Sequence, residues 1–568
     1  MSPYYTSLNK FYTERQWPKC DVIVGNPPFI GNKRLRTELG DAYTKAVFDA
    51  YGDRLPATSD FCCYWFEKAR DLIAEGKCQR AGLLGTTSSK QISSRQAFER
   101  IKSSGRIFFA VSDRDWFDKG TAIRICMVGF GGKDAPDLPV LDDQQVPEIN
   151  ADLTSGLDTT GKHVLRNNRG FCFMGSTKVG DFDIPEATAV AWLLKSHVKQ
   201  SCNSDVLRPF RNGSDLVRSD SGRWVIDFGV TMTEAEAARY SSPFEFVRVH
   251  VKPFRDQNNR KLYREKWWIH AEPRPGFRSA VQALSRYLGT ARVAKHRLFV
   301  WLDAAVLPDS KVIALAFDDD YRFGVMQSRA HEVWTDATCA MHGGERRTYN
   351  PTECFETFPF PFPDDLPQAE PPIKPPPKPR KPEPDRTYAE NLAAKNYFMG
   401  KEEYVPAGGS ARTPDEHRAA ITAAARELNE QREHWLNPME WTVERLLEFP
   451  GSANGPWARY VHQPDKSGIG TVRYPRLEPR DADCAAQLKK RTLTNLYNER
   501  PAWLDLAHQK LDAAVAAAYG WPPDLSDERI LERLLALNLE RATAEQAARP
   551  AKKTQRGKPR KNSSDPWA

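Results

Sequence analysis

The sequence lacks long hydrophobic runs and contains few cysteines. Val312 to Phe317, with six residues, is typical of its unbroken apolar stretches, whereas a membrane-spanning helix needs about 20, so we expect no membrane contact. Ten cysteines in 568 residues, without any CxxC pair, give neither a disulfide framework nor zinc-ligand spacing. We therefore expect free thiols in a reducing cytosol and no metal centre.

Acidic residues are absent from one segment near the end of the chain. The formal net charge is +8, and Arg549 to Lys561 contain seven Lys or Arg and no Asp or Glu. Subtracting that +7 from +8 leaves about +1 for all other residues. We expect a disordered basic tail over 549–568, and the overall charge then says little about the folded surface.

Three breaks divide the chain, whose length exceeds what one hydrophobic core usually supports. The first is the Gly-, Pro- and Asp-rich stretch from Gly131 to Pro147, and the third is the basic tail. The second is Pro367 to Pro384, whose nine prolines are typical of a semi-rigid polyproline linker. The expected segments are 1–147, 148–364, a linker over 365–387, 388–548 and 549–568.

Strand and helix patterns alternate before the first break, which predicts a doubly wound α/β sheet. A helical pattern covers Phe61–Ala74, and only eleven residues separate the last two strands, which allows them to pair antiparallel. The buried strands expected are Asp21–Gly25, Ala81–Gly85, Ile107–Val111 and Ile123–Phe130.

The segment after the linker is predicted to be helical. Thr413 and Glu416 form a capping pair around Pro414, which predicts a helix that ends near Leu436. Two further helices are expected over Ala502–Tyr519 and from Ser526 to Leu539. Residues 150–360, by contrast, mix short strand and helix patterns, as in an α+β domain.

The tetrapeptide Asn26-Pro27-Pro28-Phe29 directly follows the first strand, and ligands of α/β sheets bind at the carboxyl ends of strands. Methylation of an exocyclic amine requires acceptors that hold its N–H groups and orient its lone pair. The side-chain oxygen of Asn26 and the carbonyl of Pro27 can accept these bonds in a loop stiffened by two prolines. Phe29 offers a face on which a flipped base can stack.

Several runs resemble the enzymes that make N6-methyladenine in DNA, and more closely the large MmeI-like (type IIL/IIG) restriction-modification methyltransferases. Thr348–Pro361 and Leu493–Trp521 are also similar to that family, so the resemblance extends over most of the chain. The bare tetrapeptide is shared with RNA and protein-glutamine methyltransferases, and the combination is more specific. The catalytic-domain runs are NPPFIGNKRLRTELGDAY, DFCCYWFEKARDLI, AGLLGTTSS and GTAIRICMVGF.

This resemblance implies a class I, Rossmann-like methyltransferase sheet over 1–147, a target-recognition domain over 148–364 and a helical C-terminal region. The reaction implied is methyl transfer from S-adenosylmethionine to a flipped adenine in double-stranded DNA. By the same resemblance Asn26 to Phe29 form the catalytic loop, and Asp60 and Phe61 begin the helix that lies against the cofactor. Phe117 matches the aromatic residue that packs on the target base, with Trp116 as its rival.

The Gly-rich loop that cradles S-adenosylmethionine in this family normally precedes the Asn-Pro-Pro motif by a long stretch. Only 25 residues precede Asn26, and we interpret Gly129 to Gly132 as a turn. We therefore expect the rear portion of a longer enzyme that lacks most of the cofactor pocket. A sheet edge is then exposed beside Asp21–Gly25, and a separate N-terminal methyltransferase or nuclease fragment is a possible partner.

Residues 251–300 contain twelve Lys or Arg and three acids, interleaved with aromatic residues. Basic side chains neutralise phosphates, and arginine can also read guanine, so we expect DNA contacts here. The alternative is a solvated basic face over an ordinary core. The densest candidates are Arg255, Arg260, Lys261, Arg264 and Lys266.

Two other functions remain open at this point. The first alternative to an active adenine methyltransferase is a non-catalytic DNA-recognition subunit or gene fragment, whose Asn-Pro-Pro-Phe loop is a relic or completes a partner's site. A methyltransferase of RNA or protein is the second alternative, which the size of the 150–360 segment disfavours.

Overall fold

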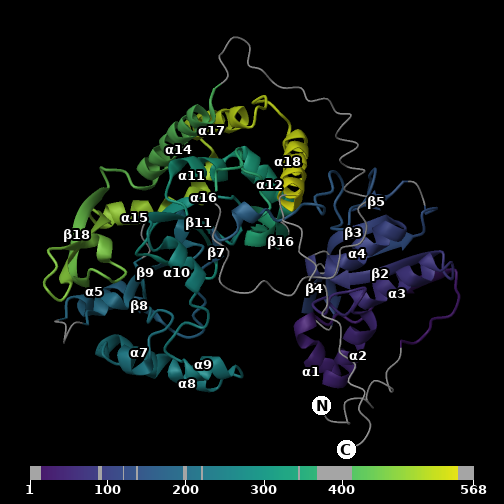
Figure 1. Cartoon of the computed structure of the whole chain (residues 1–568), viewed down its shortest axis with the longest axis horizontal. Coiled ribbons are helices and arrows are strands. Elements are labelled where there is room, and N and C mark those ends of the chain that lie inside the picture. The colour runs from purple at the N-terminus through teal and green to yellow at the C-terminus, as the bar shows by residue number, and fades with distance from the viewer. Residues whose placement is uncertain are drawn as a thin grey trace, which may run out of the picture. The chain divides into compact units, whose positions relative to one another are not determined.

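The computed structural model describes residues 14–86, 92–118, 121–135, 138–195, 201–218, 222–342, 346–366 and 412–547. These residues form two compact units, one containing the chain up to 161 together with 340–348, the other the remainder (Figure 1). Most of the expected linker, from 367, and the basic tail lie outside the described residues. None of the described helices is long and apolar enough to cross a bilayer.

The first unit contains a six-stranded sheet with the order β1-β2-β4-β3-β5-β6. β1 and β2 are parallel, whereas β4 pairs antiparallel with both β2 and β3. The antiparallel pairing of the last two predicted strands is thus confirmed, and β3 runs in the same direction as β1 and β2. The strands are β1 (Val22–Gly25), β2 (Arg80–Thr86), β3 (Arg106–Asp118), β4 (Thr121–Gly131), β5 (Val140–Leu141) and β6 (Gln144–Gln145).

Helices α3 and α4 pack together against this sheet. Phe66 of α3 lies 5.0 Å from Phe98 of α4 and 6.0 Å from Phe130 of β4, measured between ring centroids. All three rings are fully buried, so they lock both helices to the strands that carry the candidate site. The helices of this unit are α1 (Leu35–Leu39), α2 (Asp41–Tyr51), α3 (Cys63–Ala74) and α4 (Ile92–Ser104).

Strand β1 is an edge strand rather than a buried one. Among the described residues it pairs with β2 alone, and Val22 and Val24 are 54% and 81% exposed. The strand itself and the exposed edge were predicted correctly, whereas the expected burial of Asp21–Gly25 was wrong. Its apolar sequence fits a strand covered on both faces, yet these two side chains face solvent.

The second unit mixes small sheets with helices. Its two four-stranded sheets have the orders β14-β9-β10-β8 and β13-β11-β15-β7. Their strands are β7 (Cys172–Met174), β8 (Asp183–Pro185), β9 (Leu207–Arg211), β10 (Arg223–Ile226), β11 (Arg286–Ala291), β13 (Val300–Asp303), β14 (Leu307–Pro308) and β15 (Val312–Leu315). The helices before residue 340 are α5 (Glu186–Leu193), α6 (Glu234–Ala237), α7 (Ser241–His250), α8 (Lys252–Asp256), α9 (Lys261–Glu265), α10 (Pro275–Val281), α11 (Asp320–Gln327) and α12 (Arg329–Thr338).

The helices expected after the linker are present. α14 (Pro414–Leu436) begins with the predicted capping box, since Glu416 N–H donates to the Thr413 hydroxyl at 3.3 Å and Thr413 N–H to the Glu416 carboxylate at 2.7 Å. The later helices are α15 (Ala482–Lys490), α16 (Leu493–Glu499), α17 (Ala502–Ala518) and α18 (Asp527–Ala547).

The expectation of a purely helical region over 388–548 was wrong. A three-stranded antiparallel sheet interrupts it, formed by β18 (Thr442–Ser452), β19 (Val461–His462) and β20 (Ile469–Pro479). Trp457 fastens this sheet to the rest of the unit, because its indole stacks on Trp224 at 5.8 Å and donates to the Leu207 carbonyl at 3.1 Å. Burial supplied by distant residues therefore decides the strand conformation here.

Candidate active site

The loop after β1 presents unused hydrogen-bond acceptors. Pro27 is buried, Phe29 is half-buried, and Asn26 and Pro28 are exposed. The Ile30 N–H donates to the Pro28 carbonyl at 3.1 Å. No described residue bonds to the side chain of Asn26 or to the carbonyl of Pro27. The exposed Asn26 oxygen can therefore meet an incoming amine, and the Pro27 carbonyl, on a buried residue, has no donor among the described residues.

The segment before α3 anchors this loop through three hydrogen bonds. The backbone N–H of Asn32 donates to the Asp60 carboxylate at 3.2 Å, and the Asn32 side chain donates to the Thr58 carbonyl at 2.7 Å. The Phe61 N–H donates to the carbonyl of Ile30 at 3.0 Å. The loop is therefore held at Ile30 and at Asn32, just beyond the tetrapeptide, which restricts how far its acceptors can move.

Asp60 also reaches two other elements. Its second carboxylate oxygen accepts the Thr86 hydroxyl of β2 at 3.2 Å, and its N–H donates to Ser94 of α4 at 3.1 Å. Phe61 is 5% exposed and packs edge-on against Trp65 at 4.7 Å. Both residues precede α3, which begins at Cys63, two residues later than the predicted helix.

These contacts bear on the expected cofactor contact. Asp60 uses both carboxylate oxygens inside the protein, and the ring of Phe61 is internal. In the described residues the two side chains therefore fit a role in supporting the loop better than direct binding of S-adenosylmethionine, and their cofactor contact stays a prediction.

Trp116 lies near the carboxyl end of β3. It lies on β3 opposite Ile123 of β4 and is 37% exposed. β1, β2 and β3 run in the same direction, so their carboxyl ends lie at the same end of the sheet. Asn26 and Trp116 are both at that end. The backbone of Phe117 continues β3 opposite Ala122, and its side chain lies outside the described residues.

The glycines near the end of β4 have a packing explanation. Gly129 to Gly131 belong to β4 itself, so the interpretation as a turn was wrong for them, whereas Gly132 begins a turn in which its carbonyl accepts the Ala135 N–H at 3.1 Å. A Cβ atom on Gly105 would overlap the carbonyl oxygen of Gly131, and one on Gly129 would lie 3.0 Å from the ring of Phe108. Gly105 is thus required by the close approach of the Gly131 backbone, and Gly129 leaves room for the Phe108 ring, so packing accounts for these glycines.

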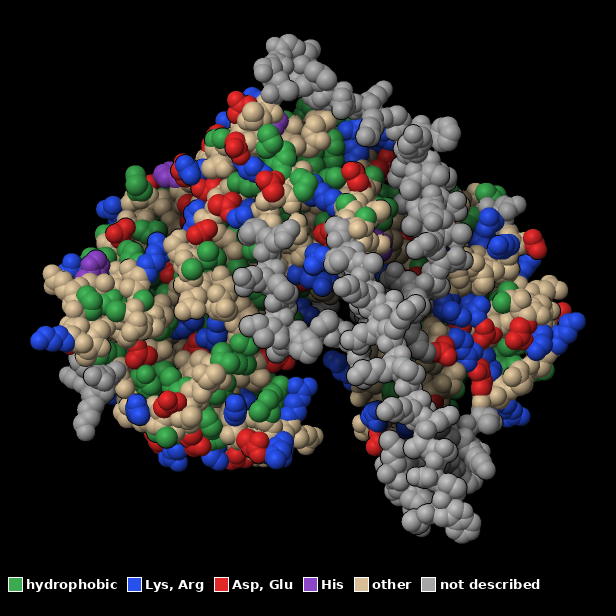
Figure 2. Space-filling view, in the orientation of Figure 1, with side chains coloured by type: hydrophobic (Ala, Val, Ile, Leu, Met, Phe, Trp, Pro, Cys, Tyr) green, Lys and Arg blue, Asp and Glu red, His purple; other side chains and the backbone are tan. Residues whose placement is uncertain are grey.

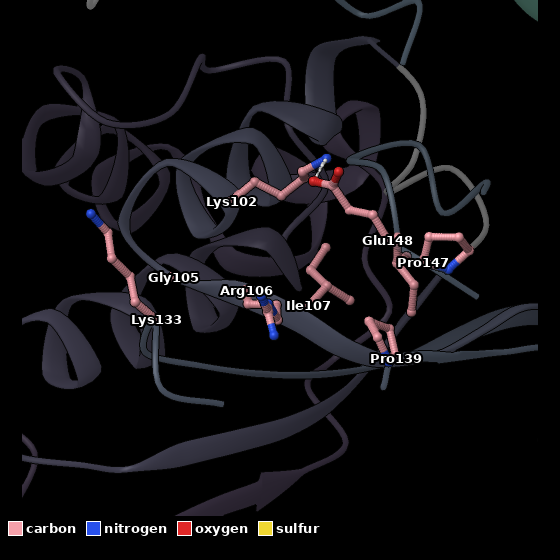
Figure 3. A pocket seen from close by; sticks show the side chains of 9 residues that line it. Lys102, Gly105, Arg106, Ile107, Lys133, Pro139, Pro147 and Glu148 are labelled. Atoms are coloured by element: carbon pink, nitrogen blue, oxygen red, sulfur yellow. Dashed lines mark ion pairs between the residues drawn. The ribbon is translucent and has the colours of Figure 1, made fainter. Parts of the chain in front are cut away.

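A cavity of about 420 Å³ lies away from the candidate site. Arg106 and Ile107 begin β3, so the cavity lies at the amino end of this strand. Asn26 follows the carboxyl end of β1, which is the opposite end of the sheet. The Lys102 ammonium, at its rim, forms an ion pair with Glu148 at 2.9 Å (Figure 3). We therefore assign the cavity no part in methyl transfer. Its lining consists of Lys102, Gly105, Arg106, Ile107, Lys133, Pro139, Pro147, Glu148 and Ile149.

The prediction that Arg255 contacts DNA was wrong. Arg255 is 0% exposed, and its guanidinium donates to the carbonyls of Lys178 at 2.6 Å, Val179 at 2.5 Å and Ile269 at 3.1 Å. Burial lowers the pKa of Arg255 to about 10. Its charge is used inside the fold, because buried carbonyls need donors, and it cannot reach a phosphate.

The other four predicted basic residues are exposed on or beside α9. Arg260 donates to the Tyr263 hydroxyl at 2.6 Å, and Lys261 pairs with Glu265 at 3.4 Å. Arg264 donates to the Asn258 carbonyl at 2.5 Å. Together with Lys266 these side chains are accessible to DNA, and their contact with DNA stays a prediction.

The sequence reasoning missed Asn32, Thr58 and Thr86, which support the loop through hydrogen bonds. Asn32 lies six residues after Asn26, and Thr86 ends the strand that pairs with β1. Polar residues next to strand ends were therefore the available signal. Which of them meet depends on the conformation of the chain between them.

A family model and two solved structures are similar to parts of this chain. Residues 8–138 match the family model described as the MmeI DNA-methyltransferase domain. No curated protein matches the chain. The solved structure of the type IIL restriction-modification enzyme MmeI in complex with DNA is similar with a TM-score of 0.59 and 16% identity, over 92% of this chain and 57% of that one.

A second solved structure, the type IIG restriction endonuclease BpuSI, has 8% identity over 59% of this chain and 46% of that one. Its TM-score of 0.21 is too low to support an argument. The chain spans 57% of the length of MmeI, and the segment that holds both Asn26 and Trp116 lies within the family match. The resemblance to MmeI-like methyltransferases is therefore confirmed, by the family match in the first unit and by the fold over most of the chain.

Proposed function

We propose that this chain contributes the amine-binding half of a site-specific adenine-N6 methyltransferase that acts on double-stranded DNA in a restriction-modification system. The observation that carries the proposal is the anchored loop after β1, in which Asn26 is exposed and the Pro27 carbonyl has no donor among the described residues. Two fixed acceptors are what an exocyclic amine with two N–H groups requires.

The chemistry follows from this arrangement. The oxygen of Asn26 and the carbonyl of Pro27 each accept one N–H of the adenine amine and orient its lone pair. S-adenosylmethionine, when bound, supplies an electrophilic methyl group to that lone pair. The bond from sulfur to the methyl carbon would break with its electron pair left on sulfur, and the methylated nitrogen would release one proton to solvent. Neither the amide oxygen of Asn26 nor the Pro27 carbonyl titrates, so neither has to take up that proton. Phe29 and Trp116 provide aromatic surface for the extruded base.

The glycines of β4 are explained by packing within the strand and against Phe108, which supports the view that the cofactor cradle lies outside the described residues. Among the described residues β1 pairs with β2 alone, and its other edge, in a strand with Val22 and Val24 exposed, fits an added β-strand. We therefore propose that a further segment, which carries the cofactor-binding part of the site, pairs with β1. The same observation favours the second candidate function, a DNA-recognition subunit that is not catalytic by itself.

The test uses the full chain mixed with a polypeptide that supplies the cofactor-binding part of an MmeI-like methyltransferase, with methyl-labelled S-adenosylmethionine and unmethylated duplex DNA. Mass spectrometry of the digested nucleosides should show N6-methyladenine for the mixture. Asn26→Ala should lower its rate of formation by roughly 10²- to 10³-fold. Methylation at the parental rate by Asn26→Ala would show that the loop is not catalytic, and no methylation by any mixture would favour the recognition subunit.

A further inference from the structure

The segment of α7, α8 and α9 exposes three large apolar side chains within fourteen residues. Val249 is 51% exposed, and Phe254 and Leu262 are each 58% exposed. Basic, acidic and hydrophobic side chains are mixed on the visible surface of this segment (Figure 2). Exposed apolar side chains that gather in this way commonly mark an interaction site.

The two most exposed of these side chains stand beside buried anchors. Phe254 precedes Arg255, whose guanidinium is bonded to three backbone carbonyls from distant segments and, at 3.4 Å, to the Tyr263 carbonyl. Leu262 precedes Tyr263, which is 8% exposed. Each exposed side chain is therefore held outward by a neighbour fixed in the core. A surface that is rigid before binding loses little conformational entropy on binding.

The acids of this segment are each paired with a nearby cation. Asp256 accepts from Lys252 at 3.0 Å, and Glu265 accepts from Lys261 at 3.4 Å. Glu245 of α7 likewise pairs with Arg248 at 2.6 Å. Its three acidic side chains are thus balanced one for one.

Three cations remain in excess of these pairs. Arg260 and Arg264 bond to a hydroxyl and a carbonyl, both neutral, and Lys266 makes no ion pair with another described residue. A surplus of positive charge around apolar side chains is complementary to DNA, which combines phosphates with apolar sugar and base surfaces. An apolar protein partner alone would not account for the unbalanced cations.

We propose that α8, α9 and Lys266 form a DNA-docking surface in which Phe254 and Leu262 make the apolar contacts. Arg260, Arg264 and Lys266 neutralise phosphates around them. The proposal rests on DNA being the substrate, as proposed above, and adds the contribution of the two apolar side chains. On this proposal the cations give the part of the DNA affinity that depends on salt, and the two apolar side chains give the part that does not.

The experiment measures binding of the full chain to a labelled 30-base-pair duplex of mixed sequence, without cofactor, between about 50 and 200 mM salt. The double variant Phe254→Ala/Leu262→Ala should bind roughly 10- to 100-fold more weakly, with the slope of log affinity against log salt unchanged. Lys266→Gln should instead reduce that slope by about 0.9. The matched control is Leu506→Ala on α17, where Leu506 is 54% exposed, and it should bind DNA as the parent does.

Parental DNA affinity in the double variant overturns the proposal, and a simultaneous loss of self-association in sedimentation would assign the surface to a second copy of the chain. Because both side chains are mostly exposed, the thermal midpoint should match the parent, and each single variant should show a partial loss of affinity. The assay needs no methyl transfer, so its failure leaves the catalytic proposal intact. Failure of methylation with normal DNA binding would count against catalysis alone.

Discussion

Asp60 accepts the backbone N–H of Asn32 at 3.2 Å and so ties the loop after β1 to the segment before α3. The other carboxylate oxygen of Asp60 accepts the Thr86 hydroxyl at the end of β2, also at 3.2 Å. One side chain therefore fixes the spacing between two strand ends, and the exposed Asn26 lies between the anchored part of the loop and β1.

Asp60→Ala should loosen the loop and destabilise the first unit. It removes two acceptors, and each hydrogen bond to a charged group contributes about 1.5–3 kcal/mol, so we expect a loss of about 3 kcal/mol in the free energy of unfolding. Thr86→Val removes only one of these two hydrogen bonds and should cost about 1.5 kcal/mol. Urea unfolding measures both, and limited proteolysis should cut the loop of Asp60→Ala faster. Equal stability of the two variants would contradict the bridging role.

Substitutions within the loop should separate chemistry from base binding in the complemented enzyme. Asn26→Ala removes one acceptor and should lower turnover by roughly 10²- to 10³-fold while DNA affinity stays near the parental value. Phe29→Ala removes a stacking face worth about 1–3 kcal/mol. It should also reduce the fluorescence of 2-aminopurine at the target position, which reports the flipped base. A parental methylation rate for Asn26→Ala would refute its assignment.

The basic residues should divide into two groups by their effect. Changing Arg260, Lys261 and Arg264 together to Glu should weaken DNA binding and flatten its salt dependence, since each phosphate contact contributes about 0.9 to the slope. Arg255→Met should instead destabilise the second unit by about 3 kcal/mol, because it leaves buried carbonyls without donors. Its salt slope should remain parental.

A chain that ends at residue 548 is the control for this comparison, because a basic tail alone can bind DNA without sequence preference. The charge-reversed variant should lose slope in both backgrounds. If removing the tail lowers the salt slope of DNA binding and reversing the charges of Arg260, Lys261 and Arg264 does not, the tail and not α9 provides the phosphate contacts.

The sequence was sufficient where local chemistry decides the structure. Thr413 and Glu416 cap α14 as predicted, and α14 ends at Leu436 as predicted. The strand before Asn26 and the antiparallel pairing of β3 with β4 were also predictable, because short connections and apolar runs allow few alternatives. In the site, the position of Asn26 at a strand end followed from the same patterns.

Prediction failed where distant residues decide. Arg255 looks like its basic neighbours in the sequence, and only the carbonyls of Lys178 and Val179, more than 70 positions away, make it a buried donor. The sheet of β18 to β20 likewise depends on Trp457 packing against Trp224. The role of Asp60 as a bridge could not be inferred, because neither Asn32 nor Thr86 is near it in the sequence.

His270 should make the second unit sensitive to mild acid. It is 3% exposed, its Nδ1 lies 2.8 Å from the Ser176 hydroxyl and its Nε2 lies 2.9 Å from the Ile226 carbonyl. Burial lowers the pKa of His270 to about 4. The Asp227 carboxylate and the Ile226 carbonyl oppose this shift, whereas the Arg278 and Lys178 cations add to it.

The sign follows from proton uptake on unfolding. Between pH 6.5 and 4 an exposed His270 in the unfolded chain binds a proton that the folded chain excludes, so acid favours unfolding. The stabilising contribution is complete above pH 6.5 and is lost as the pH falls toward 4. Burial also lowers the pKa values of His331 and His508 to about 3, so they should act in the same direction. The pKa of Asp227 is lowered as well, and the stability that this carboxylate contributes is lost only at lower pH than that of His270.

The test compares the parent with His270→Phe, which keeps an aromatic ring beside Phe182 and cannot titrate. Each excluded proton contributes about 1.36 kcal/mol per pH unit, so removing one should lower the slope of the free energy of unfolding by about that amount near pH 5. The baseline stability of the variant should also fall, because two hydrogen bonds are lost, but this offset does not depend on pH. Urea unfolding at several values between pH 4 and 7 separates the offset from the slope. An unchanged slope would mean that His270 takes up its proton without unfolding, and that its burial does not exclude the charged form.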